Sequence, residues 1–117
     1  MQTAIQHLYK PPHEGNGLLY AWFLSMHTRV DIILYSQKPE RELLLVVNRI
    51  YDALYRLEKI ANFYDPDSEL SFVNRTASIS PIVLSEELYS MIDLCLEYNS
   101  KTLGYFDITV HSENYTQ

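Results

Sequence analysis

The chain has 117 residues, enough for one compact domain, and 47% of them are hydrophobic, enough to form a core. It contains only three glycines, where an average usage of roughly 7% predicts about eight, so a glycine-rich phosphate-binding loop is not favoured. Nine basic and fifteen acidic residues give a formal net charge of −6, and the basic residues are scattered singly, which argues against nucleic-acid binding.

The sequence also lacks signals for membrane insertion or export. Its longest apolar run, Leu18 to Leu24, is far shorter than the ~20 residues that a membrane span requires. The first residues contain no apolar segment with a small-residue cleavage site and no lipidation cysteine. The single cysteine, Cys95, cannot form an internal disulfide, which is typical of a reducing compartment. We therefore expect a cytoplasmic protein without a membrane span.

The amino-terminal third predicts a lead-in followed by a pair of strands. Residues 1–17 contain Pro11-Pro12 and a Gly-Asn-Gly cluster and are expected to be irregular, before a single domain over residues 18–117. Residues 18–24 form an aromatic-rich apolar run that favours a buried strand. Residues 29–35 alternate between apolar and polar over part of their length, so the segment Ser25–Thr28 is expected to join two antiparallel strands.

The rest of the chain predicts two main helices. Apolar residues recur at helical spacing from Pro39 to just before Asp65-Pro66, and again after Ser85, a predicted helix cap. Between them, Asp67 or Ser68 can cap a short helical turn through residue 74. Residues 82–84 and 106–110 are expected to be strands. The predicted fold class is therefore α+β, a mainly antiparallel sheet packed with two main helices.

Local motifs predict neither a metal site nor a catalytic residue. No two of the four histidines are four residues apart, the spacing that a helical zinc motif uses. Asp65, Asp67 and Glu69 have the spacing of the first ligands of a calcium loop, but Leu70 stands where such a loop needs glycine. Cys95 lies on the apolar face of its predicted helix, where packing explains it better than catalysis does.

Three segments, in this order and spacing, resemble the ApbE family of FAD:protein FMN transferases, formerly called thiamine-biosynthesis lipoproteins. SMHTRVDI is similar to the family's opening "MGT" strand, and TLGYFDITV to its "TgGaFDiTv" segment. Between them, RLEKIANFYDPDSELSFVNR is similar to its helix, its tyrosine-containing turn and its "dSELsrlN" element. The resemblance runs from about Tyr20 to Val110.

The resemblance implies an FAD site and indicates which residues would form it. Met26 and Tyr64 would contact the flavin, and the triplet Tyr105, Phe106 and Asp107 would line the FAD site. A thioether and aromatic faces suit a planar ring system, and a carboxylate can accept hydrogen bonds from a ribose hydroxyl or a ring N–H. The family activity is Mg²⁺-dependent transfer of FMN from FAD to a Ser or Thr of a protein.

The sequence departs from the family pattern at two glycines and in extent. His27 stands where "MGT" has glycine, and Leu103-Gly104 replaces a glycine pair. Only the amino-terminal portion of the family is matched, without the "GGN" and "DPrTG" segments or the Mg²⁺ ligands, so we expect a truncated ApbE-like protein that binds FAD but is not catalytically competent alone. The family is often exported, whereas this sequence shows no export signal.

Two alternatives remain open at this stage. Tyrosine-rich helix faces, with Tyr51, Tyr55 and Tyr89 at helical spacing, suit an oligomer interface. The chain would then be a non-catalytic assembly or interaction protein that associates with itself through apolar surface. Otherwise a separate polypeptide supplies the missing half and completes the site.

Overall fold

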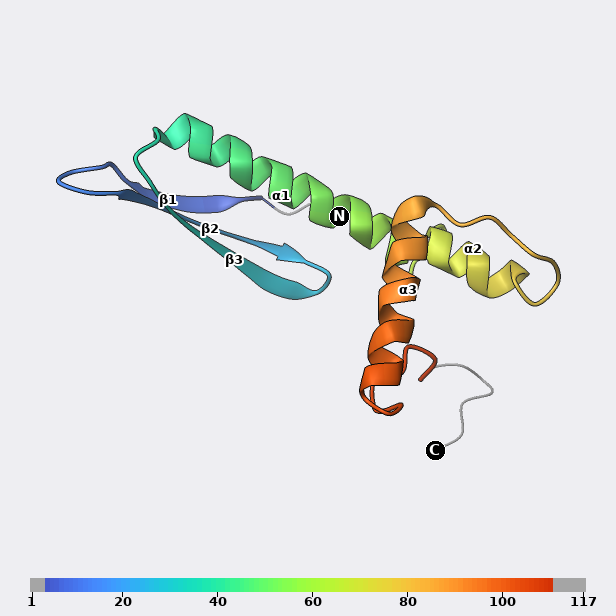
Figure 1. Ribbon diagram of the computed structural model, residues 1–117. Helices are drawn as coiled ribbons and strands as arrows, with labels where there is room; N and C mark the ends of the chain where they lie inside the picture. The colour runs from blue at the N-terminus through green and yellow to red at the C-terminus, as the bar shows by residue number, and fades with distance from the viewer. Residues whose placement is uncertain (1–3, 111–117) are drawn as a thin grey trace.

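The computed structural model describes residues 4–110 and contains a three-stranded antiparallel sheet and three helices (Figure 1). This arrangement confirms the predicted α+β class. The strand order in the sheet follows the chain, so no crossover connection is needed. In chain order the elements are β1 (Gln6–Lys10), β2 (Gly17–Ser25), β3 (Thr28–Ser36), α1 (Glu40–Ala61), α2 (Glu69–Thr76) and α3 (Glu86–Lys101).

The core lies between one face of the sheet and α1. Alternate residues of the central strand β2, Leu19, Ala21 and Phe23, are buried on the face toward α1. From α1, Leu43, Val47 and Tyr51 meet them, each one helical turn after the last. The ring of Tyr51 packs edge-on against Phe23, with ring centroids 4.9 Å apart. The residues that recur every four positions in α1 therefore pack on those that recur every two positions in β2.

The hairpin between β2 and β3 confirms the predicted antiparallel pair and shortens its connection. Ser25 and Thr28 are paired residues of the ladder, so only Met26 and His27 form the turn. Their φ angles are 53° and 59°, as in a type I′ turn, which favours glycine at both positions because a Cβ crowds the backbone there. His27 occupies the second position, the one most often held by glycine.

Residues 6–10 are a strand, so the prediction of an irregular lead-in over residues 1–17 was wrong there. β1 pairs with the free edge of β2, from Gln6 opposite Trp22 to Lys10 opposite Leu18. The prolines and glycines lie only in the loop that connects β1 to β2 and at the first residue of β2. At its end, a Cβ on Gly17 would meet the Lys10 carbonyl oxygen at 2.5 Å, so glycine is required by close approach.

Two predicted strands are absent from the described part of the chain. Residues 82–84 have no regular structure, and Val83 is 97% exposed with no strand beside it. Residues 106–110 form turns instead of a strand. There the Asp107 carboxylate accepts hydrogen bonds from the backbone N–H and the hydroxyl of Thr109, at 2.9 and 2.6 Å. Such local bonds stabilise a turn in competition with a strand.

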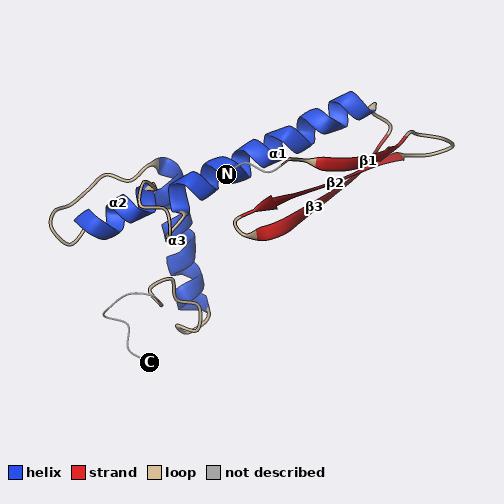
Figure 2. Ribbon diagram, turned by 180° about the vertical axis from the view of Figure 1, so that it is seen from behind, coloured by secondary structure: helices blue, strands red, loops and turns tan. Residues whose placement is uncertain are grey.

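The molecule is elongated. Its radius of gyration is 18.9 Å, where a compact chain of this length has about 13 Å, and its extents are 60 × 32 × 23 Å. The carboxyl-terminal end of α1 extends past the sheet and carries α2 and α3, with α3 running across the direction of α1 (Figures 1 and 2). Many large apolar side chains of α3 and of the segment after it are consequently exposed: Tyr89, Leu94, Leu96, Tyr98, Leu103, Tyr105, Phe106, Ile108 and Val110.

Candidate functional site

The residues expected to contact a flavin lie in three separate turns. Met26 is in the β2–β3 turn, with its side chain 46% exposed. Tyr64 lies between α1 and α2, and Tyr105 to Asp107 follow α3. No hydrogen bond, ion pair or ring contact joins these three groups to one another within residues 4–110. The described part of the chain therefore presents them as three separate surfaces.

The turn that presents Tyr64 is held by polar bonds on both sides. The Tyr64 backbone N–H donates to Asn62 Oδ1 at 3.0 Å, and the Asp67 N–H donates to Asp65 Oδ1 at 2.9 Å. The Tyr64 ring packs edge-on against Phe63, yet its side chain is 76% exposed. A fixed backbone and an exposed ring suit a residue that stacks on a planar ligand.

Two buried serines, Ser68 and Ser71, donate hydrogen bonds to backbone carbonyls of this turn. The sequence pattern indicated a role only for Ser68, as a helix cap. Ser68 caps α2 by accepting the Ser71 N–H at 3.1 Å, which decides between the two predicted caps. Its hydroxyl also donates to the Asn62 carbonyl at 2.7 Å. The Ser71 hydroxyl donates to the Asp65 carbonyl at 2.7 Å. Each hydroxyl is a second donor to its carbonyl, because the Asn62 carbonyl also accepts the Asp65 N–H at 3.2 Å and the Asp65 carbonyl also accepts the Ser68 N–H at 3.1 Å.

The segment with Tyr105, Phe106 and Asp107 follows a helix end in which two hydrogen bonds close the last turn. The Gly104 N–H donates to the Asn99 carbonyl at 2.8 Å and the Leu103 N–H to the Ser100 carbonyl at 3.2 Å, the pattern of a Schellman motif. Leu103 has φ 56° at the position that usually holds glycine. This end turns the chain back, so that Asn99 Nδ2 donates to the Phe106 carbonyl at 2.8 Å.

The three residues of this segment differ in exposure and charge. Tyr105 is 94% exposed, and the ring of Phe106 contacts Tyr98 with centroids 6.4 Å apart. The side-chain and backbone hydrogen bonds from Thr109 lower the pKa of Asp107 below its ordinary value, so the carboxyl is ionised at neutral pH. An ionised carboxylate accepts hydrogen bonds only.

Two hydrogen bonds between Glu69 and Ser85 connect α2 to α3. Glu69, in the first turn of α2, accepts hydrogen bonds from the backbone N–H and the hydroxyl of Ser85, the cap of α3. Glu69 matches the glutamate of the family's "dSELsrlN" element, but nothing in the sequence indicated that its hydrogen-bond partner lies 16 residues away.

A polar and aromatic cluster that the sequence analysis missed lies on the sheet face opposite α1. Asp31 accepts hydrogen bonds from the Tyr20 hydroxyl at 2.6 Å and from Arg29 Nε at 2.9 Å. These bonds, that from Tyr20 first, lower the pKa of Asp31, and the bond to Asp31 is the main cause of a raised pKa of Arg29. The Arg29 guanidinium also lies 5.5 Å from the centre of the Trp22 ring, which stacks on Tyr20.

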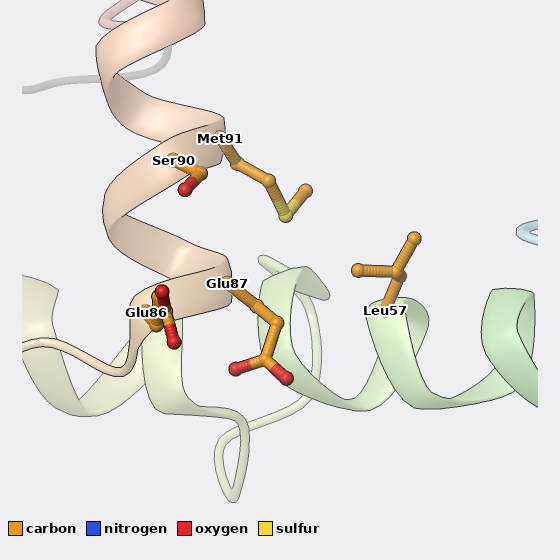
Figure 3. A pocket seen from close by; sticks show the side chains of 5 residues that line it. All are labelled: Leu57, Glu86, Glu87, Ser90 and Met91. Carbon is orange, nitrogen blue, oxygen red and sulfur yellow. The ribbon is translucent and has the colours of Figure 1, made fainter.

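An open hollow of about 420 Å³ lies between α1 and α3, away from the predicted flavin residues (Figure 3). Glu87 and Met91 of α3 point toward Leu57 of α1, and Glu86 and Ser90 complete the lining. Glu87 Oε1 lies 4.0 Å from Arg56 Nη1, and the two side chains form an exposed ion pair. The hollow holds none of the residues predicted to bind FAD.

Clusters of metal ligands and membrane-spanning helices are both absent from residues 4–110. No three histidine, cysteine or acidic side chains in them come together in a way that could hold a metal ion. The described residues therefore do not by themselves bring together three such ligands for Mg²⁺. In the same range, no helix combines the length and the hydropathy needed to cross a membrane.

Comparison with known proteins assigns the class. The family model for the ApbE family matches residues 26–114, about three-quarters of the chain. The chain therefore belongs to the ApbE family. This confirms the resemblance drawn from the three segments.

Two curated relatives carry the name FAD:protein FMN transferase. The protein from Chlamydia muridarum (strain MoPn / Nigg) is 30% identical over 80 residues, which cover 68% of this chain and 24% of the relative. The protein from Treponema pallidum (strain Nichols) is 25% identical over 84 residues, which cover 72% of this chain and 23% of the relative. The chain thus spans about a quarter of the length of the relatives it matches. No solved structure shows a significant match.

Proposed function

We propose that this chain binds a flavin nucleotide as one part of an FAD:protein FMN transferase-like protein. The observation that carries the proposal is membership of the ApbE family, together with two relatives named FAD:protein FMN transferase. The exposure of Tyr64 and Tyr105 supports it, since a planar ring can reach either side chain without a rearrangement of the core.

The chemistry of the three turns suits different parts of such a ligand. The thioether of Met26 and the ring of Tyr64 are apolar and polarisable and would pack on the flavin ring. Both hydrogen bonds from Thr109 end on Oδ1 of Asp107, so Oδ2 is the oxygen that would accept a ribose hydroxyl or a ring N–H. The ligand would bridge turns that the chain alone does not bring into contact.

We further propose that FMN transfer requires polypeptide beyond the segment that this chain shares with its relatives. In that family the transfer depends on Mg²⁺, which offsets the charge of the pyrophosphate. Within residues 4–110, no three candidate ligands for such an ion come together. The isolated chain is therefore expected to bind FAD without transferring FMN, and a second polypeptide would supply the metal-binding part.

Titration of the purified chain with FAD, followed by flavin fluorescence with and without Mg²⁺, tests the proposal. We expect saturable binding that Mg²⁺ changes little. Replacement of Tyr64 or Tyr105 by alanine is expected to weaken binding about threefold to tenfold, the value of one aromatic contact. Absence of binding at high micromolar FAD would contradict the proposal.

Tyr35→Ala is the matched control. Tyr35 is an exposed tyrosine, at 71%, on a strand and outside all three turns. Its replacement should leave FAD binding unchanged. An equal loss in the control and in Tyr64→Ala would show that the effect is not specific to the proposed site.

A non-catalytic assembly protein is the second candidate. The elongated shape and the exposed apolar residues of α3 favour it, since apolar surface of this extent tends to associate. Light scattering on the eluting chain, in the absence of flavin, tests it. A monomer at every concentration would argue against this candidate and would leave the flavin proposal standing.

A further inference from the structure

The segment that carries Tyr105, Phe106 and Asp107 has little apolar packing to hold it in place. Tyr105 is 94% exposed and Phe106 is 44% exposed, with the Phe106 ring against Tyr98 in the last turns of α3. A segment with few buried apolar contacts opens readily unless polar bonds hold it. The place of these three residues in the structure therefore depends on hydrogen bonds.

Two side chains from the end of α3 bind both backbone polar groups of Phe106. Asn99 Nδ2 donates to the Phe106 carbonyl at 2.8 Å, and the Phe106 N–H donates to Thr102 Oγ1 at 2.9 Å. The segment accordingly turns back beside the end of α3 (Figure 1). The first bond fixes the peptide unit between Phe106 and Asp107, and the second fixes the unit between Tyr105 and Phe106. The side chains of Tyr105 and Asp107 extend from the ends of these two units.

Asn99 and Thr102 are themselves held by the helix. The Thr102 hydroxyl donates to the Tyr98 carbonyl at 2.7 Å, which leaves its oxygen as an acceptor for the Phe106 N–H. The Asn99 carbonyl accepts the Gly104 N–H at 2.8 Å, and this bond brings the following residues back toward the Asn99 side chain. Both side chains are half-buried. A ligand would therefore meet a segment that is already ordered, which lowers the entropy lost on binding.

The Asp107 carboxylate is held as well. Both hydrogen bonds from Thr109 end on its Oδ1, so Oδ2 is the oxygen that would serve a ligand. We infer that Asn99 and Thr102 are positioning residues of the flavin site: they act through the Phe106 backbone and hold its two neighbours in the geometry that binds. The inference rests on the proposed flavin binding and extends it to two residues that need not touch the ligand.

Thr102→Val tests the bond to the Phe106 N–H, because valine has the shape of threonine without the hydroxyl. In the chain without ligand, hydrogen exchange followed by NMR should show the Phe106 amide exchanging about fivefold faster, the value of one hydrogen bond. FAD affinity should fall about threefold to tenfold, because the segment must then be ordered when the ligand binds. Thr102→Ser keeps the hydroxyl and is expected to restore both the slow exchange and the affinity.

Thr76→Val is the matched control. Thr76 is the last residue of α2, and its hydroxyl donates to the Phe72 carbonyl at 2.7 Å, as the Thr102 hydroxyl does to Tyr98. Both substitutions therefore remove the same bond to a helix carbonyl, and Thr102→Val also removes the bond to Phe106. The thermal midpoints of the two variants should be similar, whereas FAD binding should weaken only in Thr102→Val. An equal loss of affinity in both variants would overturn the inference.

Asn99→Asp tests the second bond. A carboxylate has the shape of the amide but cannot donate to the Phe106 carbonyl, so FAD affinity should fall about threefold to tenfold here as well. Asn48→Asp is its control, because Asn48 Nδ2 donates to the Leu44 carbonyl at 2.8 Å within α1 and the substitution adds the same negative charge. FAD binding should be unchanged in Asn48→Asp. A loss of equal size in both variants would overturn the role of Asn99, since charge alone would explain it.

A double substitution shows whether Thr102 acts through this segment. In a chain that already carries Tyr105→Ala, Thr102→Val should weaken FAD binding less than it does in the unsubstituted chain. The reason is that one of the two side chains that Thr102 positions is then absent. Fully additive losses of affinity would contradict an action through the segment.

The results that overturn this inference differ from those that overturn flavin binding itself. If the unsubstituted chain binds FAD and Thr102→Val binds it equally well, the positioning role is overturned and the proposed function stands. An unchanged exchange rate of the Phe106 amide in Thr102→Val has the same consequence. If the unsubstituted chain does not bind FAD, the proposed function fails and the positioning role fails with it.

Discussion

The Glu69 carboxylate accepts two hydrogen bonds from Ser85, one from the backbone N–H at 2.7 Å and one from the hydroxyl at 2.5 Å. The pair connects the first turn of α2 to the cap of α3. Ser85 in turn accepts the Leu88 N–H at 3.2 Å, and Leu88 is the one buried residue of α3. A single carboxylate therefore helps to set the position of the helix that leads to the Tyr105 segment.

Glu69→Gln is expected to lower the free energy of unfolding by about 1 to 2 kcal/mol, because the amide keeps one acceptor oxygen where the carboxylate has two. Urea denaturation followed by circular dichroism measures the change. Glu86→Gln is the control, since Glu86 is exposed in the first turn of α3. Equal midpoints for Glu69→Gln and the unsubstituted chain would contradict the role of the pair.

Ser71→Ala is expected to cost about 0.5 to 1.5 kcal/mol, because the Asp65 carbonyl loses the hydrogen bond from the Ser71 hydroxyl and keeps only the one from the Ser68 N–H. The same change should loosen the turn that presents Tyr64 and therefore weaken FAD binding. Denaturation and FAD titration measure the two effects. Ser90→Ala, at an exposed position of α3, is the control and should change neither. Unchanged stability in Ser71→Ala would show that the buried hydroxyl bonds carry little weight.

His27→Gly and Leu103→Gly are each expected to stabilise the chain by about 0.5 to 1 kcal/mol. Both residues have positive φ, 59° and 56°, where a side chain costs about 1 to 2 kcal/mol and glycine recovers this less its own entropy. The thermal midpoint measures the gain. Arg49→Gly, in the interior of α1 and with ordinary helical geometry, should instead lose about 1 kcal/mol. A loss of stability in all three variants would refute the strain at these two positions.

Acid should destabilise the sheet through Asp31. Its pKa in the folded chain lies below the ordinary 3.8, chiefly because of the Tyr20 hydrogen bond and then Arg29. The unfolded chain therefore takes up the proton first, and the stabilisation is present above pH 3.8 and lost as the pH falls through the lowered folded pKa. Thermal midpoints from pH 7 down to about pH 3 should fall less for Asp31→Asn than for Asp52→Asn, a control on α1. Parallel curves for the two variants would contradict this dependence.

The sequence predicted those elements whose signals are local. The helical repeat of Leu43, Val47 and Tyr51 gave α1, and Ser85 was correctly read as the cap of α3. β1 was missed because only Tyr9 of its five residues is partly buried, so the segment carries little pattern, and the free edge of β2 supplies the hydrogen bonds. The strand predicted at 106–110 has suitable residues but no neighbouring strand in the described chain, so the Asp107 turn prevails.

The candidate site shows the same division. Met26 and Tyr64 were expected in turns and lie in turns, whereas Phe106 and Asp107 were expected in a strand and lie in an irregular segment after α3. The Glu69–Ser85 pair and the Arg29–Asp31–Tyr20 cluster join residues that a sequence pattern does not relate. Whether Met26 and Tyr64 meet around one ligand depends on long-range packing, for which neither periodicity nor motif spacing gives a measure.

Helix α1 sets both the distance and the relative orientation between the sheet and the segment that contains Tyr64 and α2. Its first half is fixed to the sheet by Leu43 and Val47, and its last residues, before Asn62, carry the Tyr64 turn and α2 beyond the sheet. Along a helix each residue adds 1.5 Å and about 100° of rotation. One residue inserted after Tyr51 would therefore barely change the length but would swing the Tyr64 turn about a quarter of the way around the axis. The phase of this helix, more than its length, therefore decides which side of the sheet Tyr64 faces.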